Sequence, residues 1–121
     1  MRVKDVVGRF GEDLAAQRLS AGGMVILDRN WRCRDGEIDI VGRDGECVVF
    51  VEVKTRSTSS FGDPAEAVTA RKASRLRRLA VRWLEEHRDR LDGWPPMRFD
   101  VVSVVRPPAG GVEFAHLKGA L

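Results

Sequence analysis

Residues 36–56, which read GEIDIVGRDGECVVFVEVKTR, combine two runs rich in Val and Ile with one short turn. The enrichment in β-branched residues predicts strands over 37–42 and 46–55. Asp44-Gly45 lies between the two runs and is a strong signal for a two-residue hairpin loop. The apolar side of such a hairpin has to be buried, so this stretch predicts part of a sheet that packs against other elements.

Five further segments complete the expected fold: helices over 4–21 and about 69–90, and strands over 24–32, 98–105 and 112–117. The run 98–105 is nearly continuously apolar, which is typical of a strand covered on both faces. Residues 57–64 are polar and rich in turn formers, so we expect a loop there, followed by a short turn at 64–67. The order α-β-β-β-α-β-β predicts an α/β fold with one mixed five-stranded sheet flanked by helices.

Length and composition limit the class of protein. At 121 residues the chain is expected to form a single domain, residues 1–121. Cys33 and Cys47 have no zinc-ligand spacing, which favours reduced thiols. The first ten residues lack the apolar stretch of a signal peptide, and no apolar run approaches the roughly 18 residues of a membrane span. We therefore expect a cytoplasmic protein with no membrane partner. The net charge of +3 permits a polyanionic partner.

The hairpin alternation assigns its charged side chains to one face. If Asp44 and Gly45 form the loop, Glu37 lies opposite Glu52, and Asp39 becomes a diagonal neighbour of Glu52 at roughly 7–8 Å. The charged side chains on this face are Glu37, Asp39, Glu52 and Lys54. The apolar side chains on the other face are Ile38, Ile40, Val49, Val51 and Val53. The pattern thus predicts two carboxylates within reach of one bound cation.

Two interpretations of the charged face are open: a solvated face of an ordinary hairpin, or a functional site. Val41, Val48 and Phe50 share this face, so we expect it to be partly covered, and carboxylates beside covered apolar groups are costly unless paired or metal-bound. Lys54 is one of only four lysines among 21 basic residues. A lysine can exchange a proton where an arginine effectively cannot, so its retention favours a site.

The spacing of Asp39, then twelve residues, then Glu52-Val53-Lys54 resembles the PD-(D/E)xK nuclease signature. The longer stretches GRFGEDLAAQRL, GEIDIVGRDG, VVFVEVKTR, FGDPAEAVTARKASRLRRLA and RFDVVSVV together resemble the YraN-like uncharacterised protein family. That family is assigned to the restriction-endonuclease-like superfamily and is similar to archaeal Holliday-junction resolvases. The resemblance implies a restriction-endonuclease-like fold and, by analogy to the resolvases, a homodimer.

The resemblance also implies roles for individual residues. Asp39, Glu52 and Lys54 match the catalytic motif of a Mg²⁺-dependent endonuclease. Glu12 matches an acidic residue that junction resolvases add to the metal site; from the sequence alone it is equally an acid favoured by the helix dipole or paired with Arg9. We expect Mg²⁺ or Mn²⁺ to be held by Asp39, Glu52, the Val53 carbonyl and Glu12, with Glu37 beside these ligands.

The second helix carries a basic stripe at spacings i, i+4, i+7 and i+11, which is either a phosphate-binding surface or the solvated side of an amphipathic helix. The expected nucleic-acid contacts are Arg71, Lys72, Arg75, Arg78, Arg82, Arg56 and Ser57. The favoured function is a metal-dependent nuclease that acts on DNA, with branched or junction DNA as one candidate substrate and RNA left open as the target. The alternative is a non-catalytic module on the same fold that binds nucleic acid or a protein.

Overall fold

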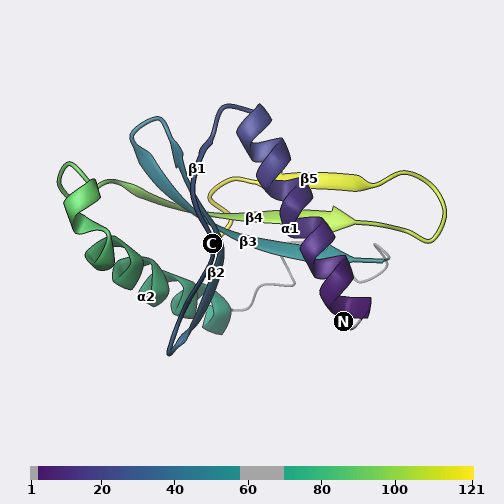
Figure 1. The fold of residues 1–121 in the computed structure, drawn as a ribbon, viewed down its shortest axis with the longest axis horizontal. Coiled ribbons are helices and arrows are strands. Elements are labelled where there is room, and N and C mark those ends of the chain that lie inside the picture. The colour runs from purple at the N-terminus through teal and green to yellow at the C-terminus, as the bar shows by residue number, and fades with distance from the viewer. Residues whose placement is uncertain (1–2, 58–69) are drawn as a thin grey trace.

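The structure of the protein is a computed structural model that describes residues 3–57 and 70–121. Its elements are α1 (Val3–Ala21), β1 (Val25–Cys33), β2 (Gly36–Asp44), β3 (Cys47–Arg56), α2 (Ala70–Glu86), η2 (Arg88–Arg90), β4 (Met97–Val105) and β5 (Glu113–Leu117) (Figure 1). The predicted order α-β-β-β-α-β-β is confirmed. The helix expected to run to residue 90 ends at Glu86, and a short 3₁₀ turn follows. The turn at 64–67 and all of the loop 57–64 except Ser57 lie outside the described residues.

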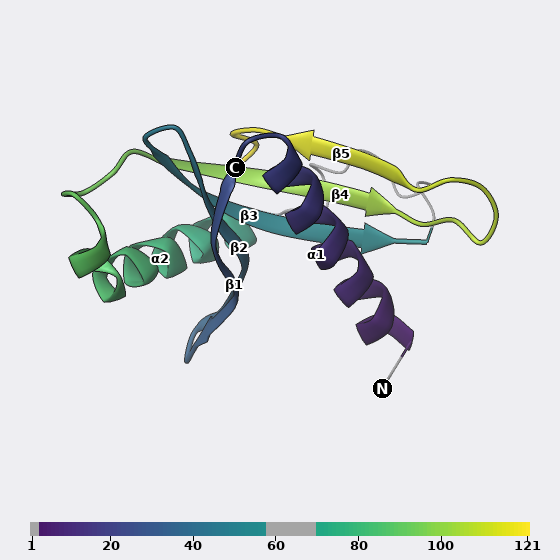
Figure 2. The same cartoon turned by 45° about the horizontal axis from the view of Figure 1, so that its top comes forward.

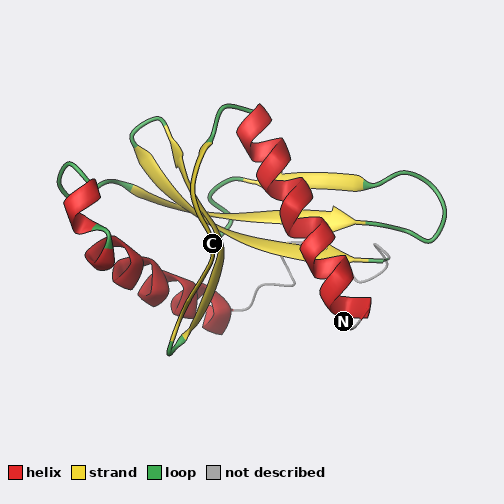
Figure 3. Cartoon of the chain, in the orientation of Figure 1, coloured by secondary structure: helices red, strands yellow, loops and turns green. Residues whose placement is uncertain are grey.

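The five strands form one mixed sheet in the order β1-β2-β3-β4-β5. β3 and β4 pair in parallel, whereas the other neighbours pair antiparallel. The mixed five-stranded sheet is therefore confirmed, with the apolar strand β4 inside it and β5 at one edge. Figure 3 shows that the β1–β2 hairpin is strongly twisted and runs steeply across the direction of β3, β4 and β5.

The two helices cover opposite faces of the sheet. Along β3, Val49 and Val51 belong to the apolar cluster that includes α1, and Val48 and Phe50 belong to the cluster that includes α2. Figure 2 shows α1 lying across β3 and β4, with α2 apart from it beside the β1–β2 hairpin. The face with the predicted carboxylates is thus covered by α2. Within the described ranges, no helix is both long enough and apolar enough to cross a membrane.

Each helix is held by a specific contact with the sheet. α1 approaches β3 so closely that a Cβ atom at Gly11 would lie 1.8 Å from Thr55 Oγ1. A larger residue than glycine would therefore clash with the Thr55 side chain in this position. α2 buries Trp83, whose indole Nε1 donates a hydrogen bond of 3.0 Å to Asp28 of β1. The Trp83 ring also meets Phe50 of β3 edge to face, with 6.0 Å between the ring centroids. These contacts fix where the two helices cross the sheet.

The predicted register of the β2–β3 hairpin is wrong by two residues. Asp44 pairs with Cys47, so the loop residues are Gly45 and Glu46 rather than Asp44 and Gly45. Gly45 has a φ of 63°, the left-handed conformation that glycine adopts without strain. Asp44 stays in the strand, where its carboxylate accepts a bond of 3.0 Å from Arg98 of β4. A shift of two residues preserves the alternation, so this correction of the register does not by itself move any side chain to the other face.

The corrected register changes which residues face each other. Glu37 was expected opposite Glu52, but the ladder between β2 and β3 ends with Ile40 opposite Val51, and on its other side Glu37 pairs with Arg32 of β1. Beyond Ile40 a side-chain contact joins the two strands, because the Val53 backbone N–H donates a hydrogen bond of 2.8 Å to Asp39 Oδ2. This contact keeps Asp39 next to the segment of β3 that contains Glu52.

The assignment of Ile38 to the same apolar face as Ile40 is also wrong. Ile40 packs in the cluster that includes α1, whereas Ile38 packs in the cluster that includes α2. Both side chains are fully buried. The strong twist of the β1–β2 hairpin separates them, because the end of the hairpin turns toward α2 (Figure 1). Asp39 lies between these two buried residues, at the point where the strand changes direction.

Candidate active site

A cavity of about 620 Å³ opens where the end of the β1–β2 hairpin meets β3 and the first turns of α2. Its acidic lining residues are Glu37, Asp39 and Glu52, and its basic lining residues are Arg32, Arg34, Lys72 and Arg75. The acids of the cavity therefore come from β2 and β3, and its bases come from the tip of the β1–β2 hairpin and from α2. The twist of the hairpin toward α2 creates this meeting point.

Asp39 is the most deeply buried acid of the cavity, with 8% of its surface exposed. Its Oδ2 atom accepts a hydrogen bond of 2.8 Å from the Val53 backbone N–H. Burial, followed by the negative charge of Glu52, raises the pKa of Asp39 to about 8, and the Val53 bond only partly opposes this. Glu12 and Glu37 raise that pKa further. Burial and the surrounding acids thus both oppose the ionisation of Asp39.

Glu12 extends from α1 toward the same group of acids. Burial is the main cause that raises the pKa of Glu12, and the charge of Glu37 adds to it. Side-chain hydrogen bonds with Asn30 and Asp39 lower the pKa in part. The Glu12 side chain is partly buried. The structure also brings Glu12 to Asp39, although 27 positions separate them in the sequence.

Two ion pairs border the acids. Lys54 Nζ lies 3.1 Å from Glu52 Oε1, and Arg32 Nε lies 3.1 Å from Glu37 Oε2. Lys54 also contacts the Lys72 amine from α2. Burial lowers the pKa of Lys54, but its contacts with Lys72 and Glu52 outweigh burial and raise it; the contact with Lys54 lowers the pKa of Lys72. We therefore expect Lys54, which lies against Glu52, to hold its proton more firmly than Lys72.

The donor set suits a hard cation, which prefers carboxylate and carbonyl oxygens. Such an ion would relieve the repulsion that raises the pKa of Asp39. Among the described residues, however, no three His, Cys, Asp or Glu side chains are grouped closely enough to hold a metal ion as they stand. Glu52 and Glu37 are engaged by Lys54 and Arg32. Metal ligation by this set therefore requires the glutamates to exchange partners.

The predicted nucleic-acid contacts divide into those at the cavity and those beside it. Lys72 and Arg75 line the cavity. Arg71, Arg78 and Arg82 are exposed on α2. Arg82 forms an ion pair with Asp35 at the tip of the β1–β2 hairpin, and Arg78 donates to Ser74. Arg56 and Ser57 lie at the end of β3 and are not among the cavity-lining residues.

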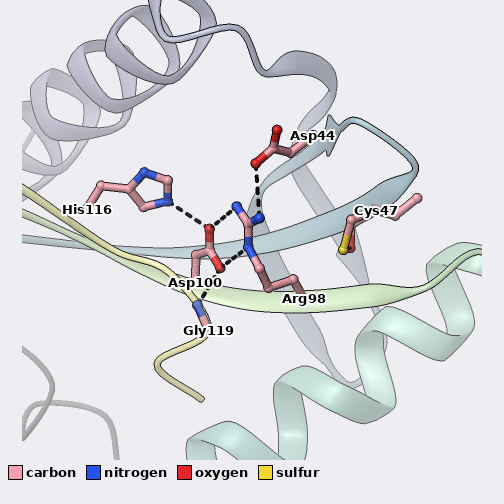
Figure 4. Close-up of polar contacts among 7 residues, drawn as sticks. Asp44, Cys47, Arg98, Asp100, His116 and Gly119 are labelled. Carbon is pink, nitrogen blue, oxygen red and sulfur yellow. Dashed lines mark hydrogen bonds and ion pairs between the residues drawn. The ribbon is translucent and has the colours of Figure 1, made fainter.

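Two features of the structure were not predicted from the sequence. Arg32 and Arg34, which flank Cys33 near the hairpin tip, line the cavity because the hairpin bends toward α2. The second is a buried polar network around Asp100 of β4 (Figure 4). Asp100 accepts two bonds of 2.9 Å from Arg98, one of 2.7 Å from His116 and one of 2.9 Å from the Gly119 backbone N–H. An aspartate inside an apolar run, two residues from an arginine, was the signal that could have revealed it.

The sequence is similar to the proteins of one known family. The sequence matches the family described as "Uncharacterised protein family UPF0102" over residues 11–104. It is 60% identical to a UPF0102 protein of Frankia alni over 99% of this chain and 98% of the relative. It is 54% identical to a UPF0102 protein of Beutenbergia cavernae over 98% of each chain. A UPF0102 protein of Streptomyces coelicolor is 50% identical over 98% of this chain and 91% of the relative.

Proposed function

This chain belongs to the uncharacterised protein family UPF0102, and we propose that it is a metal-dependent nuclease that hydrolyses phosphodiester bonds in DNA. One observation carries the proposal. The buried carboxyl of Asp39 lies near Glu12, Glu37 and Glu52, and it lines a cavity that basic residues of the β1–β2 hairpin and of α2 also line. Crowded acids favour a divalent cation, and basic walls favour a phosphate-bearing ligand.

The sequence resemblance supports the same proposal. UPF0102 is the YraN-like family that the chain resembles, and the motif of Asp39, Glu52 and Lys54 resembles the PD-(D/E)xK signature. On this resemblance we propose a restriction-endonuclease-like active site, with branched or junction DNA as a substrate to be tested first. The likeness to archaeal junction resolvases also leads us to propose a homodimer, which light scattering at micromolar concentration tests.

The chain's own residues have separate roles in the proposed reaction. Asp39, Glu52 and the Val53 carbonyl would hold Mg²⁺ or Mn²⁺, with Glu12 as a further ligand and Glu37 beside them. The bound ion would supply Lewis-acid polarisation of a phosphodiester oxygen and a lower pKa for a water molecule. Lys54 donates hydrogen bonds to the attacking water or to the charge that develops on the phosphate.

The basic wall of the cavity would hold the DNA backbone. Arg75 and Lys72 contact the phosphates nearest the acids, and Arg71 and Arg78 extend the contact along the exposed face of α2. Each phosphate contact adds affinity that falls with salt. Arg82 is already paired with Asp35, so it contributes less than the others. Arg56 and Ser57 would contact the strand beyond the end of β3.

The test is cleavage of a labelled four-way junction, duplex DNA, single-stranded DNA and RNA with Mg²⁺ or Mn²⁺. We expect DNA cleavage by the unmodified protein and a loss of at least about 100-fold in Asp39→Asn, since this change removes a proposed metal ligand. Asp92→Asn is the matched control, because Asp92 is exposed and lies outside the cavity. Equal cleavage by the unmodified protein and Asp39→Asn refutes the proposed site. Cleavage of RNA alone refutes DNA as the substrate.

A second candidate is a non-catalytic module that binds nucleic acid or a protein. The observation that favours it is the Lys54–Glu52 ion pair, which occupies a proposed metal ligand. Among the described residues, moreover, no three acids lie close enough together to hold a metal ion as they stand. Calorimetric titration with Mn²⁺ separates the two candidates. A nuclease binds Mn²⁺ and loses that binding in Glu52→Gln, whereas a binding module shows no Mn²⁺ heat and keeps its nucleic-acid affinity in Glu52→Gln.

A further inference from the structure

A second cavity, of about 170 Å³, opens between the end of α1, the β2–β3 hairpin and β5. Its apolar lining residues Leu19, Met24 and Phe114 belong to or pack against the cluster that includes α1. The candidate active site is instead lined by Leu76 and Leu79 of the cluster that includes α2. The two cavities therefore lie on opposite faces of the sheet.

The lining of this second cavity carries an excess of basic residues. They are Arg18 from the last turn of α1, His116 of β5 and Lys118 just beyond β5. Asp44 is the one acid among the described lining residues, and Arg98 already lies 3.0 Å from its carboxylate. Among the described residues, neither Arg18 nor Lys118 has a carboxylate within ion-pair distance. The cavity is therefore suited to an anion.

The buried network around Asp100 holds two of these basic residues in place (Figure 4). Asp100 accepts a hydrogen bond of 2.7 Å from His116 Nε2 and one of 2.9 Å from the Gly119 backbone N–H. The chain is thus fixed to the same carboxylate on both sides of Lys118. Because Nε2 donates to Asp100, the second ring nitrogen of His116, Nδ1, is directed away from it, toward the side of α1. Nδ1 accepts a hydrogen bond in neutral imidazole and donates one in imidazolium.

Arg18 is positioned from the helix side of the cavity. Its Cζ atom lies 5.3 Å from the centre of the Phe114 ring, so the guanidinium is held over β5. The carbonyls at the end of a helix repel anions. Here the backbone N–H groups of Gly22 and Met24 donate hydrogen bonds of 3.1 and 3.0 Å to two carbonyls of the last turns of α1. These bonds and the charge of Arg18 offset that repulsion.

We propose that this cavity binds a phosphate group, with Arg18 and Lys118 supplying the positive charge and His116 Nδ1 a further hydrogen bond. Its volume of about 170 Å³ suits a single phosphate group. Sites that enclose larger organic ligands have roughly 300–1,000 Å³. Inorganic phosphate and the terminal phosphate of a nucleic-acid strand share this chemistry. The site goes beyond the proposed nuclease function and does not depend on it.

Histidine NMR gives a direct measurement, because the chain contains only two histidines. His87 stacks on Trp83 of α2 and does not line the second cavity, so it is the internal reference. We would titrate ¹⁵N-histidine-labelled protein with inorganic phosphate near pH 6.5, where an ordinary imidazole is about half charged. Sodium chloride keeps the ionic strength constant. We expect the His116 ring signals to shift with one saturable midpoint and the His87 signals to lack that midpoint.

Variants give the decisive comparison. In Lys118→Ala we expect the phosphate affinity to fall by about 10-fold, as for loss of a charged hydrogen-bond partner. Lys118 is exposed, so this change leaves the Asp100 network intact. Arg18→Met should lower the affinity similarly while keeping an apolar side chain over Phe114. Arg88→Ala is the matched control, because it removes one exposed positive charge outside the cavity. Unchanged affinity in Lys118→Ala or Arg18→Met overturns the proposal, as does a lack of saturation at His116 or a midpoint shared with His87.

Two further ligands separate the sources of the phosphate: a short thymidine oligonucleotide with a 5′-phosphate and the same oligonucleotide without it. Saturation of His116 by inorganic phosphate and by the 5′-phosphorylated strand, but not by the unphosphorylated one, assigns the site to nucleic-acid ends. Saturation by inorganic phosphate alone assigns it to free phosphate. Equal saturation by both oligonucleotides overturns a site for a terminal phosphate. No divalent metal is added, so the result is independent of whether the protein cleaves DNA.

Discussion

Replacement of Asp39 by asparagine removes the ionisation that the fold opposes, so it should stabilise the metal-free protein. The native carboxyl keeps its proton up to a pKa of about 8, against 3.8 for an unperturbed aspartate. Between these two values the native state binds more protons at this site than the unfolded state does. The stability that goes with the protonated carboxyl of Asp39 is therefore fully present below pH 3.8. It decreases as pH rises, and above about pH 8 the full destabilisation from the ionised carboxylate remains.

The magnitude follows from the difference between the two pKa values, which is about four pH units. Each unit corresponds to about 1.4 kcal/mol, so the full penalty on the free energy of unfolding is on the order of 5 kcal/mol. Between pH 5 and pH 7 the unmodified protein should lose roughly 3 kcal/mol relative to Asp39→Asn. The asparagine carbonyl can still accept the hydrogen bond from Val53, so the variant keeps the local geometry.

Urea denaturation followed by tryptophan fluorescence at pH 5, 6 and 7, with a chelator present, measures this difference. Asp92→Asn is the control, since it makes the same chemical change at an exposed position. Saturating Mn²⁺ should stabilise the unmodified protein and leave Asp39→Asn unchanged, because a cation replaces the proton on the carboxylate. Parallel pH profiles for the unmodified protein and Asp39→Asn in chelator would refute the assigned environment of Asp39.

Three further predictions test other parts of the structure. Asp100→Asn should lower the free energy of unfolding by roughly 3–5 kcal/mol at pH 7, because it breaks a buried charged network. The network lowers the pKa of Asp100, so its contribution to stability is fully present above the pKa of an unperturbed aspartate and is lost as pH falls through the lowered pKa. In urea melts the variant should therefore lack this loss of stability at acid pH. Gly11→Ala should cost about 1–3 kcal/mol by overpacking against Thr55, and a second change of Thr55→Gly should recover part of it in a double-mutant cycle. In fluorescence anisotropy with duplex DNA, Arg78→Ala should reduce the slope of log affinity against log salt by about 1, and Arg82→Ala by less, because Asp35 already neutralises Arg82.

The hairpin shows which geometric information the sequence contains. Alternation of side chains predicts which residues share a face, and a shift of two residues leaves that prediction intact. The twist of the hairpin nevertheless places Ile38 and Ile40 in different clusters. The register itself depends on whether Asp44 is a loop or a strand residue, and Asp-Gly is compatible with both. A bond from Arg98, 54 positions away, keeps Asp44 in the strand. The register therefore depends on a tertiary contact, which cannot be predicted from the residues of the turn.

The helices show a related limit. Periodicity predicted both helices, and α2 buries the apolar side of its sequence, including Leu76, Leu79 and Trp83. It did not predict where each helix crosses the sheet, because that depends on close contacts such as Gly11 with Thr55. The position of each helix on the sheet also brings Glu12 to Asp39 and Lys72 to the cavity, so neither meeting could be derived from helical spacing.

Asp39 and Asp100, the buried aspartates among the residues that the structure describes, have opposite electrostatic environments. Asp100 is fully buried and accepts four hydrogen bonds, two of them from Arg98, which outweigh the effect of burial and lower its pKa. Asp39 is almost as buried, but it accepts one bond, from Val53, and faces other acids, so its pKa rises. A carboxylate that only stabilises a fold acquires donors, as Asp100 has. Asp39 lies beside Glu52 without such donors, which is explained if a positively charged ligand completes the site. The metal ion of a metal-dependent nuclease would be such a ligand.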